Sequence, residues 1–129
     1  MSAWKWMARI CSKTLLTKTW SLRLYYWWKK LQYRKGYVEK EEINPKKVVF
    51  EAYMGKKYAC SPKALYQAMC RDPQYRDWEL IWAFREPERY REMEKEPHTK
   101  VVRYRSGEYY RAYASAKFWV TNSRLPREL

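Results

Sequence analysis

The sequence predicts an α/β fold in which helices cover a parallel sheet and a basic helical arm precedes the sheet. Short β-rich runs alternate with helical segments through most of the chain. Apolar side chains recur at helical spacing near the N-terminus, where basic residues accumulate and the first acidic residue is Glu39. With 129 residues, 47% of them hydrophobic, the chain suits one domain with a buried core.

Residues 1–37 form the predicted arm. Apolar side chains step by three or four residues, with a phase slip at residues 17–19. The pattern predicts two helical stretches, or one helix bent at that polar triplet, with Gly36 as the C-terminal stop. Lysine and arginine interrupt the arm too often for a spanning helix, which needs about 20 apolar residues. They also exclude the apolar stretch of a signal peptide.

The mixture of tryptophan and cations in the arm favours a helix that lies in a membrane interface. Trp side chains prefer the headgroup region, and each basic residue near an anionic leaflet contributes on the order of 1 kcal/mol. The predicted membrane contacts are Trp4, Lys5, Trp6, Arg9, Lys13, Trp20, Arg23, Trp27, Trp28, Lys29 and Lys30. Two alternatives remain open for this segment: an amphipathic helix packed on the protein's own core, and an arm that tracks a nucleic-acid backbone.

The overall charge makes polyanions the expected partners. The chain has 28 Lys+Arg against 14 Asp+Glu, a formal net charge of +14. Such a surface attracts nucleic acid, anionic lipid or a phosphate-rich polymer, and composition alone does not choose among them.

The first strand of the body is predicted over residues 48–53, and it ends at Gly55. A helix is predicted to start at Pro62, with Ser61 as its N-cap, and to continue to residue 69. The expected inward face of this helix consists of Leu65, Ala68 and Met69.

Three more strands follow, over residues 78–84, 101–104 and 118–121. A charged loop with a short helix is predicted between the first two, and a helix over residues 107–116 precedes the last. The order βαβαβαβ predicts a Rossmann-like, parallel-sheet half-domain. In such sheets ligands bind beyond the carboxyl ends of the strands, which places residues 53–61, 85–86, 105–106 and 122–123 around one cleft edge.

The sequence offers little catalytic chemistry. Its only histidine, His98, lies in a polar loop and is expected to be a solvated surface residue. No cluster of histidine, cysteine and carboxylate has metal-ligand spacing, so no metal is expected. Three glycines are too few for a dinucleotide or P-loop motif, so no cofactor is expected either. Taken alone, the residues predict a binding half-domain rather than a complete enzyme.

Two segments carry a family resemblance. Residues 50–58 read F-E-A-Y-M-G-K-K-Y and run on to S-P-K-A-L-Y at 61–66, and residues 116–126 read A-K-F-W-V-T-N-S-R-L-P. Both resemble the CDP-glycerol glycerophosphotransferase family of teichoic acid synthesis, and the resemblance covers residues 46–129. Ser61 stands where that family usually has Asn. The family's W-H-G-T-P-L-K segment, with its catalytic histidine, has no counterpart in the sequence.

The resemblance implies the N-terminal domain of a GT-B-type transferase, with an arm at residues 1–37 and an acceptor-side domain at residues 38–129. It implies glycerol phosphate transfer from CDP-glycerol to a lipid-linked teichoic acid acceptor, with the chain inactive alone. The expected partners are that acceptor, an anionic membrane and a C-terminal half that binds CDP-glycerol. The expected location is the cytoplasmic face of the plasma membrane of a Gram-positive-type bacterium.

The candidate acceptor contacts lie at the ends of the first and last strands. They are Gly55, Lys56, Lys57, Tyr58, Ser61, Asn122 and Ser123. Some of these residues also have simpler structural explanations: a tight turn at Gly55, a plain helix cap at Ser61, and a turn at residues 122–123. The alternatives for the whole chain are a small basic nucleic-acid-binding protein and a truncated fragment without an independent role.

Overall fold

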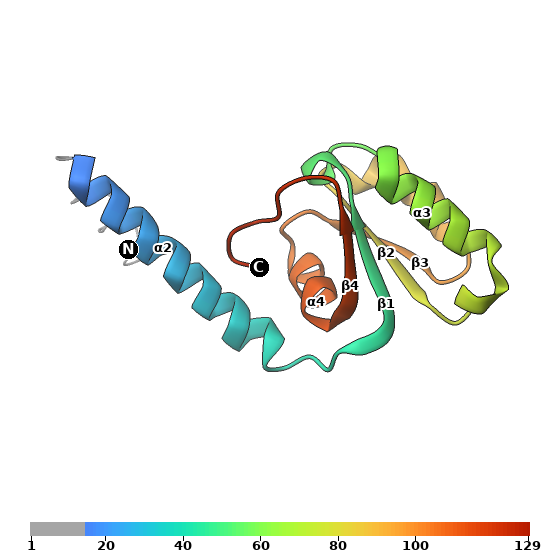
Figure 1. Ribbon diagram of the computed structural model, residues 1–129, viewed down its shortest axis with the longest axis horizontal. Helices are drawn as coiled ribbons and strands as arrows, with labels where there is room; N and C mark the ends of the chain where they lie inside the picture. The colour runs from blue at the N-terminus through green and yellow to red at the C-terminus, as the bar shows by residue number, and fades with distance from the viewer. Residues whose placement is uncertain (1–14) are drawn as a thin grey trace.

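The computed structural model describes residues 15–129, with side chains from residue 19, and it shows a single parallel sheet flanked by helices (Figure 1). The strand order is β3-β2-β1-β4, so the chain reverses its direction of travel across the sheet between β1 and β4. The strands are β1 (Asn44–Glu51), β2 (Glu79–Phe84), β3 (Thr99–Arg103) and β4 (Ala116–Thr121). The predicted α/β parallel-sheet class is confirmed.

Alternate residues of the strands form two cores, one on each face of the sheet. Phe50, Trp82 and Phe84 stack along the face under α3 (Cys60–Arg71), with successive ring centroids 5.4 Å apart. On the opposite face, Val49 and Ile81 pair across β1 and β2 and pack under α4 (Gly107–Ser115). Both faces are therefore buried at β1 and β2, as the near-continuous apolar runs of parallel strands require, whereas Phe118 and Trp119 of the edge strand β4 stay exposed.

Helix α3 buries a different face from the predicted one. Leu65 is 45% exposed, whereas Tyr66 is 4% exposed and lies with its ring edge-on to Phe50 and Trp82. The Tyr66 hydroxyl also shares a 2.8 Å hydrogen bond with Thr99 Oγ1 on β3. Since a large ring with a polar tip fills this space and finds a partner there, Tyr66 and Met69 point inward, and Leu65 and Ala68 do not.

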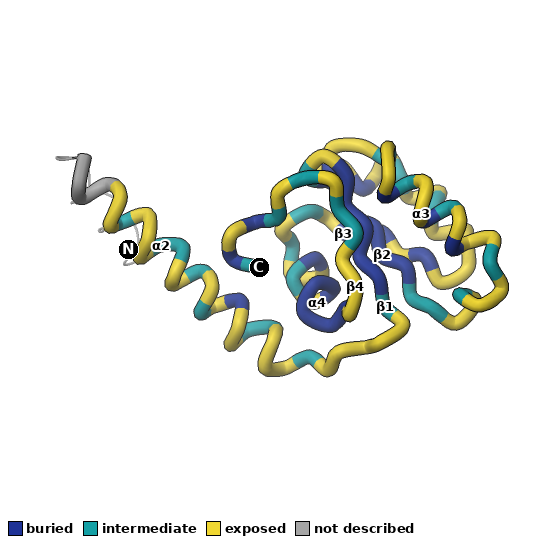
Figure 2. The backbone as a smooth tube through the Cα atoms, in the orientation of Figure 1, coloured by how far each residue is buried: buried dark blue, intermediate teal, exposed yellow. Residues whose placement is uncertain are grey.

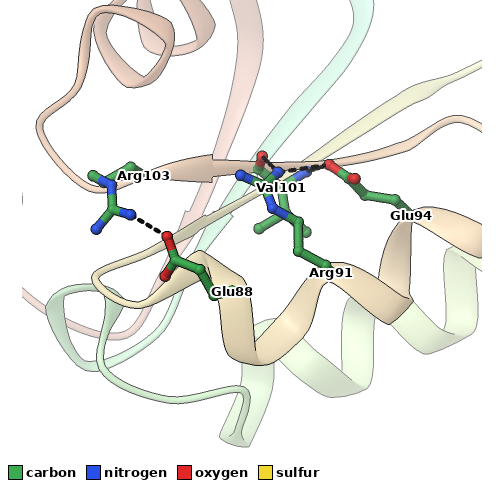
Figure 3. Close-up of polar contacts among 5 residues, drawn as sticks. All are labelled: Glu88, Arg91, Glu94, Val101 and Arg103. Carbon is green, nitrogen blue, oxygen red and sulfur yellow. Dashed lines mark hydrogen bonds and ion pairs between the residues drawn. The ribbon is translucent and has the colours of Figure 1, made fainter.

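A 3₁₀ helix, Pro87–Lys95, makes the crossover between β2 and β3. Figure 3 shows how it is fastened: Glu94 Oε1 accepts a 3.0 Å hydrogen bond from the Val101 N–H, and Arg91 donates to the Val101 carbonyl at 3.1 Å. Arg103 pairs with Glu88 further along β3. The charge-dense segment predicted here as a loop with a short helix is therefore largely helical and bound to the edge strand.

Helix α2 (Leu15–Tyr33) projects from the body as an arm, and most of its surface is exposed (Figures 1 and 2). It runs through residues 17–19 as one helix, so a break at that triplet is not found. The predicted stop at Gly36 is wrong, because a π-helical segment, Arg34–Val38, continues through it. The Glu39 N–H bonds to the Arg34 carbonyl at 2.9 Å, and Gly36 does not adopt the positive φ of a glycine cap.

A group of tyrosines attaches the arm to the body. The ring of Tyr110 on α4 lies 5.8 Å from that of Tyr33 and 5.4 Å from that of Tyr37. Tyr33 is 7% exposed, and burial raises its pKa to about 12. Arg127, near the C-terminus, also lies over the Tyr26 ring at 4.8 Å, and most of the remaining surface of α2 is exposed. No helix in the described part of the chain is long and apolar enough to cross a membrane.

Candidate functional site

The carboxyl ends of all four strands meet at one short turn, Tyr53–Gly55, which follows β1. Its residues lie in the left-handed region, with φ of 50° at Tyr53, 57° at Met54 and 79° at Gly55. This conformation costs free energy for residues other than glycine, on the order of 1 kcal/mol or more each. Surrounding contacts must therefore hold the turn in place.

The end of β4 supplies one set of these contacts across the point where the strand order reverses. Asn122 Oδ1 accepts a hydrogen bond from the Tyr53 N–H at 2.9 Å, and Ser123 Oγ accepts one from the Met54 N–H at 2.9 Å. Asn122 and Ser123 were predicted as acceptor contacts, and the structure brings them to the predicted edge. There they hold the turn after β1.

The end of β2 supplies the second set. The Arg85 N–H donates to the Gly55 carbonyl at 2.8 Å, and Arg85 Nε donates to the Met54 carbonyl at 2.9 Å. A Cβ atom on Gly55 would lie 3.3 Å from Arg85 N and 3.3 Å from Tyr104 Cδ2. Gly55 thus allows both the positive φ and the close approach of β2 and of the residue after β3, a role beyond that of a tight turn.

A buried carboxylate lies beneath this edge. Glu51, the last residue of β1, is 0% exposed, and its Oε1 accepts hydrogen bonds from the hydroxyls of Tyr109 at 2.8 Å and Tyr113 at 3.3 Å. Burial raises the Glu51 pKa, against the lowering effect of the two tyrosine hydrogen bonds and of Arg85 and Arg105. Glu51 ties α4 to the carboxyl end of β1.

Lys56 and Lys57 follow the turn and are exposed at the rim of the sheet. Lys57 Nζ lies 5.8 Å from the centre of the Tyr53 ring, a cation–π arrangement. Tyr58 turns away from the rim and packs edge-on against Trp82, with the ring centroids 5.0 Å apart. Of the candidate residues after Gly55, the two lysines therefore offer free charge to a ligand.

Ser61 does not cap α3. The helix begins at Cys60, its N-cap residue is Ala59, and no side chain of the described residues caps it. The Lys63 N–H bonds to the Ala59 carbonyl at 3.4 Å, so the first turn starts two residues earlier than predicted. Ser61 is exposed in that first turn, where the helix N-terminus favours a negatively charged group.

Glu51 was not placed at this site from the sequence, whereas Arg85 and Arg105 were predicted to lie at this edge without being named as acceptor contacts. Their positions at or just after strand ends were a usable signal, because the sheet topology puts all such positions at one edge. Their partners were not predictable from spacing alone. Within residues 15–129, no group of three His, Cys, Asp or Glu side chains is placed to hold a metal ion.

The exposed face of α2 forms a second candidate surface. Trp20 is 64% exposed and Trp27 is 61% exposed, and Arg23 lies over Trp20 at 5.5 Å. Trp28 and Lys30 are also exposed, and Lys29 is half-buried. The remaining predicted membrane contacts, Trp4, Lys5, Trp6, Arg9 and Lys13, lie outside the described residues.

Comparison with known proteins gives a consistent result. The family model described as CDP-glycerol:poly(glycerophosphate) glycerophosphotransferase matches residues 32–129. The teichoic acid poly(glycerol phosphate) polymerase of Staphylococcus epidermidis is 38% identical over 88 residues, which is 68% of this chain and 12% of that protein. The corresponding polymerase of Bacillus spizizenii is 34% identical over 83 residues, 64% of this chain and 21% of that protein.

Solved structures of the wall teichoic acid polymerase TagF superpose with a TM-score of 0.61 at 34% identity, over 78% of this chain and 24% of that chain. The fold is thus that of part of a GT-B transferase. The chain spans well under a third of the length of each of these relatives.

Proposed function

Since the chain belongs to the CDP-glycerol:poly(glycerophosphate) glycerophosphotransferase family, we propose that it acts in teichoic acid synthesis as the membrane-docking and acceptor-binding part of a glycerophosphotransferase. The proposal assigns the polymer acceptor to the carboxyl edge of the sheet and the lipid surface to α2. The donor CDP-glycerol and the catalytic histidines are assigned to a C-terminal half. The protein would work at the cytoplasmic face of the plasma membrane of a Gram-positive bacterium, as befits its Staphylococcus and Bacillus relatives.

The observation that carries the acceptor assignment is the convergence of the strand ends on Tyr53–Gly55, with Lys56 and Lys57 exposed beside it. Parallel sheets bind ligands at this edge, and the reversal of strand order lies between β1 and β4. A poly(glycerol phosphate) chain carries one negative charge per unit, so a cationic rim complements it. The uncapped N-terminus of α3 adds backbone N–H groups, whose partial positive charge also favours an anionic ligand.

The membrane assignment is supported by the composition of the exposed face of α2. Its indole rings suit the headgroup region, and its arginine and lysine side chains attract anionic lipid. A helix that served only as a packing element would bury such rings. In the described part of α2, only Tyr33 is buried.

The test uses vesicles of anionic lipid, with and without a lipid-linked oligo(glycerol phosphate) acceptor. We expect the chain to float with the vesicles in both cases and to bind more tightly when the acceptor is present. With labelled CDP-glycerol added, we expect no transfer by this chain alone. Equal binding with and without acceptor would contradict the acceptor assignment, failure to float would contradict the membrane assignment, and turnover would contradict the placement of the chemistry on another segment.

A further inference from the structure

Two arginines share one tyrosine ring at the proposed acceptor edge. Arg85 follows β2, Arg105 lies just after β3, and both are exposed. The Arg85 Cζ atom is 4.9 Å from the centre of the Tyr104 ring, and the Arg105 Cζ atom is 5.4 Å from it. The π system of the ring attracts both guanidinium groups, so both charges lie against one side chain.

Backbone hydrogen bonds hold the Arg85 side chain and the residue that carries the shared ring. Arg85 is anchored to the turn after β1 through its Nε and its backbone N–H, as described above. The Tyr104 N–H donates to the Phe84 carbonyl at 2.8 Å, which fixes the ring beside β2. Arg105 has a φ of 60°, a left-handed conformation that a non-glycine residue keeps only where its surroundings require it.

Neighbouring arginines are neutralised, and these two are not. Arg103 pairs with Glu88 (Figure 3), Arg91 with Glu94 and Arg89 with Glu86. Among the described residues, neither Arg85 nor Arg105 has a carboxylate oxygen within 4.0 Å. Glu51 attracts both guanidinium groups and Glu128 attracts that of Arg105, but neither carboxylate forms an ion pair with them. Two guanidinium groups on one ring are thus left without an ion-pair partner at the proposed ligand-binding edge.

We infer that Arg85 and Arg105 form a subsite for one phosphodiester group of the polymer acceptor. Arginine offers parallel N–H donors that fit two phosphate oxygens. A pair of arginines therefore recognises phosphate more specifically than a diffuse cationic surface does. Lys56 and Lys57 continue the positive rim on the β1 side, where the next unit of the polymer would lie. The inference rests on the proposed function and deepens it, because it names the residues that recognise the repeating phosphate.

A flexible polyphosphodiester fits this surface better than a nucleic acid. Proteins that bind single-stranded nucleic acids stack the bases on free aromatic rings. At this edge Tyr104 carries two arginines, and Tyr53 carries Lys57 over its ring. Charged groups rather than free rings are presented, which suits a ligand without bases.

The experiment measures binding of a soluble synthetic oligo(glycerol phosphate) to the full chain at fixed ionic strength. Arg85→Gln/Arg105→Gln removes the pair, and Arg71→Gln/Arg76→Gln removes the same charge from exposed arginines elsewhere on the surface. We expect about a tenfold loss of affinity for each arginine of the pair, and less than about a twofold change in the control. Arg85→Lys/Arg105→Lys keeps the charge but not the fork of donors, and we expect it to lose part of the affinity.

The outcomes distinguish failure of the arginine subsite from failure of the proposed acceptor-binding function. If the wild-type chain binds the oligomer and both glutamine variants weaken binding equally, the subsite is wrong and acceptor binding stands. If the wild-type chain does not bind the oligomer at all, the proposed acceptor function itself fails. The control ligand is an oligodeoxythymidine with the same number of phosphates. If it binds as tightly and depends equally on Arg85 and Arg105, the choice of polymer is overturned. Thermal unfolding of each variant must match the wild type for a loss of binding to count.

Discussion

Asn122 Oδ1 accepts a 2.9 Å hydrogen bond from the backbone N–H of Tyr53, a residue 69 positions earlier in the chain. The bond crosses from the end of β4 to the turn after β1, where a parallel sheet of this topology places its ligands. Ser123 repeats the arrangement at Met54. Asn122 and Ser123, predicted from the sequence as ligand contacts, therefore support the turn beside which the ligand is proposed to bind.

We expect Asn122→Ala to loosen the turn more than it destabilises the protein. The bond is exposed, so water replaces it in part, and the free energy of unfolding should fall by about 1 kcal/mol. Amide hydrogen exchange at Tyr53 and Met54 should become faster, while exchange in β2 stays unchanged. Asn44→Ala, which removes an exposed side-chain bond to the Lys46 N–H, is the control. Unchanged exchange at Tyr53 in the Asn122 variant would contradict this support role.

Gly55→Ala should be among the most damaging single-methyl additions in the chain. The new Cβ would meet Arg85 N and Tyr104 at 3.3 Å, at a residue whose φ is +79°. We expect a loss of about 1–3 kcal/mol in the free energy of unfolding, measured by urea denaturation. Gly36→Ala is the matched control, because its added Cβ would meet no atom from elsewhere in the fold within 4 Å and its φ is not positive. Equal stability of the two variants would show that the turn relaxes easily.

Glu51 should make the protein less stable as the pH rises. Burial raises its folded-state pKa above the ordinary value of 4.5, so the folded chain keeps the proton after the unfolded chain has lost it. The stabilising contribution is therefore complete below about pH 4.5 and is lost as pH rises through the folded-state pKa, at up to about 1.4 kcal/mol per pH unit.

Glu51→Gln keeps an oxygen acceptor for Tyr109 and Tyr113 without the titration. Relative to the wild type, this variant should gain stability between pH 4.5 and pH 8 in urea titrations. Glu108→Gln, on the exposed first turn of α4, should show no comparable trend. A difference between Glu51→Gln and wild type that stays constant over this pH range would exclude the predicted titration.

Trp20→Ala/Trp27→Ala should weaken attachment to anionic vesicles without unfolding the protein. Both indoles are largely exposed, so their removal costs little internal packing but takes apolar area from the proposed interface. We expect a loss of vesicle affinity of at least about tenfold in flotation or tryptophan-fluorescence titrations. Leu65→Ala, which removes a 45% exposed side chain from α3, should bind vesicles as the wild type does. Equal loss in both variants would argue against α2 as the docking surface.

Local pattern was enough to predict the order and most of the extents of the strands and helices. The apolar runs of β2 and β3 and the helix after Ser106 follow from neighbouring residues. The first strand, predicted over residues 48–53, is observed at Asn44–Glu51, so it begins four residues earlier and ends two residues earlier. Predictions failed where a distant contact overrode local preference. In α3 Tyr66 is buried in place of the predicted Leu65, because the Tyr66 side chain contacts Phe50, Trp82 and Thr99. The helix does not end at Gly36, because a π-helical segment continues to Val38 and the Tyr37 ring packs on Tyr110.

The sequence by itself determined the parallel α/β class, the cationic character and the family, because hydrophobic periodicity, net charge and short motifs are properties of neighbouring residues. The tertiary structure alone decided that Glu51 is buried under two tyrosines, that Asn122 supports Tyr53, and that Arg85 and Arg105 meet on one ring. These contacts join residues from about 20 to nearly 70 positions apart. Their geometry depends on the register of four strands at once, and no local pattern encodes that register.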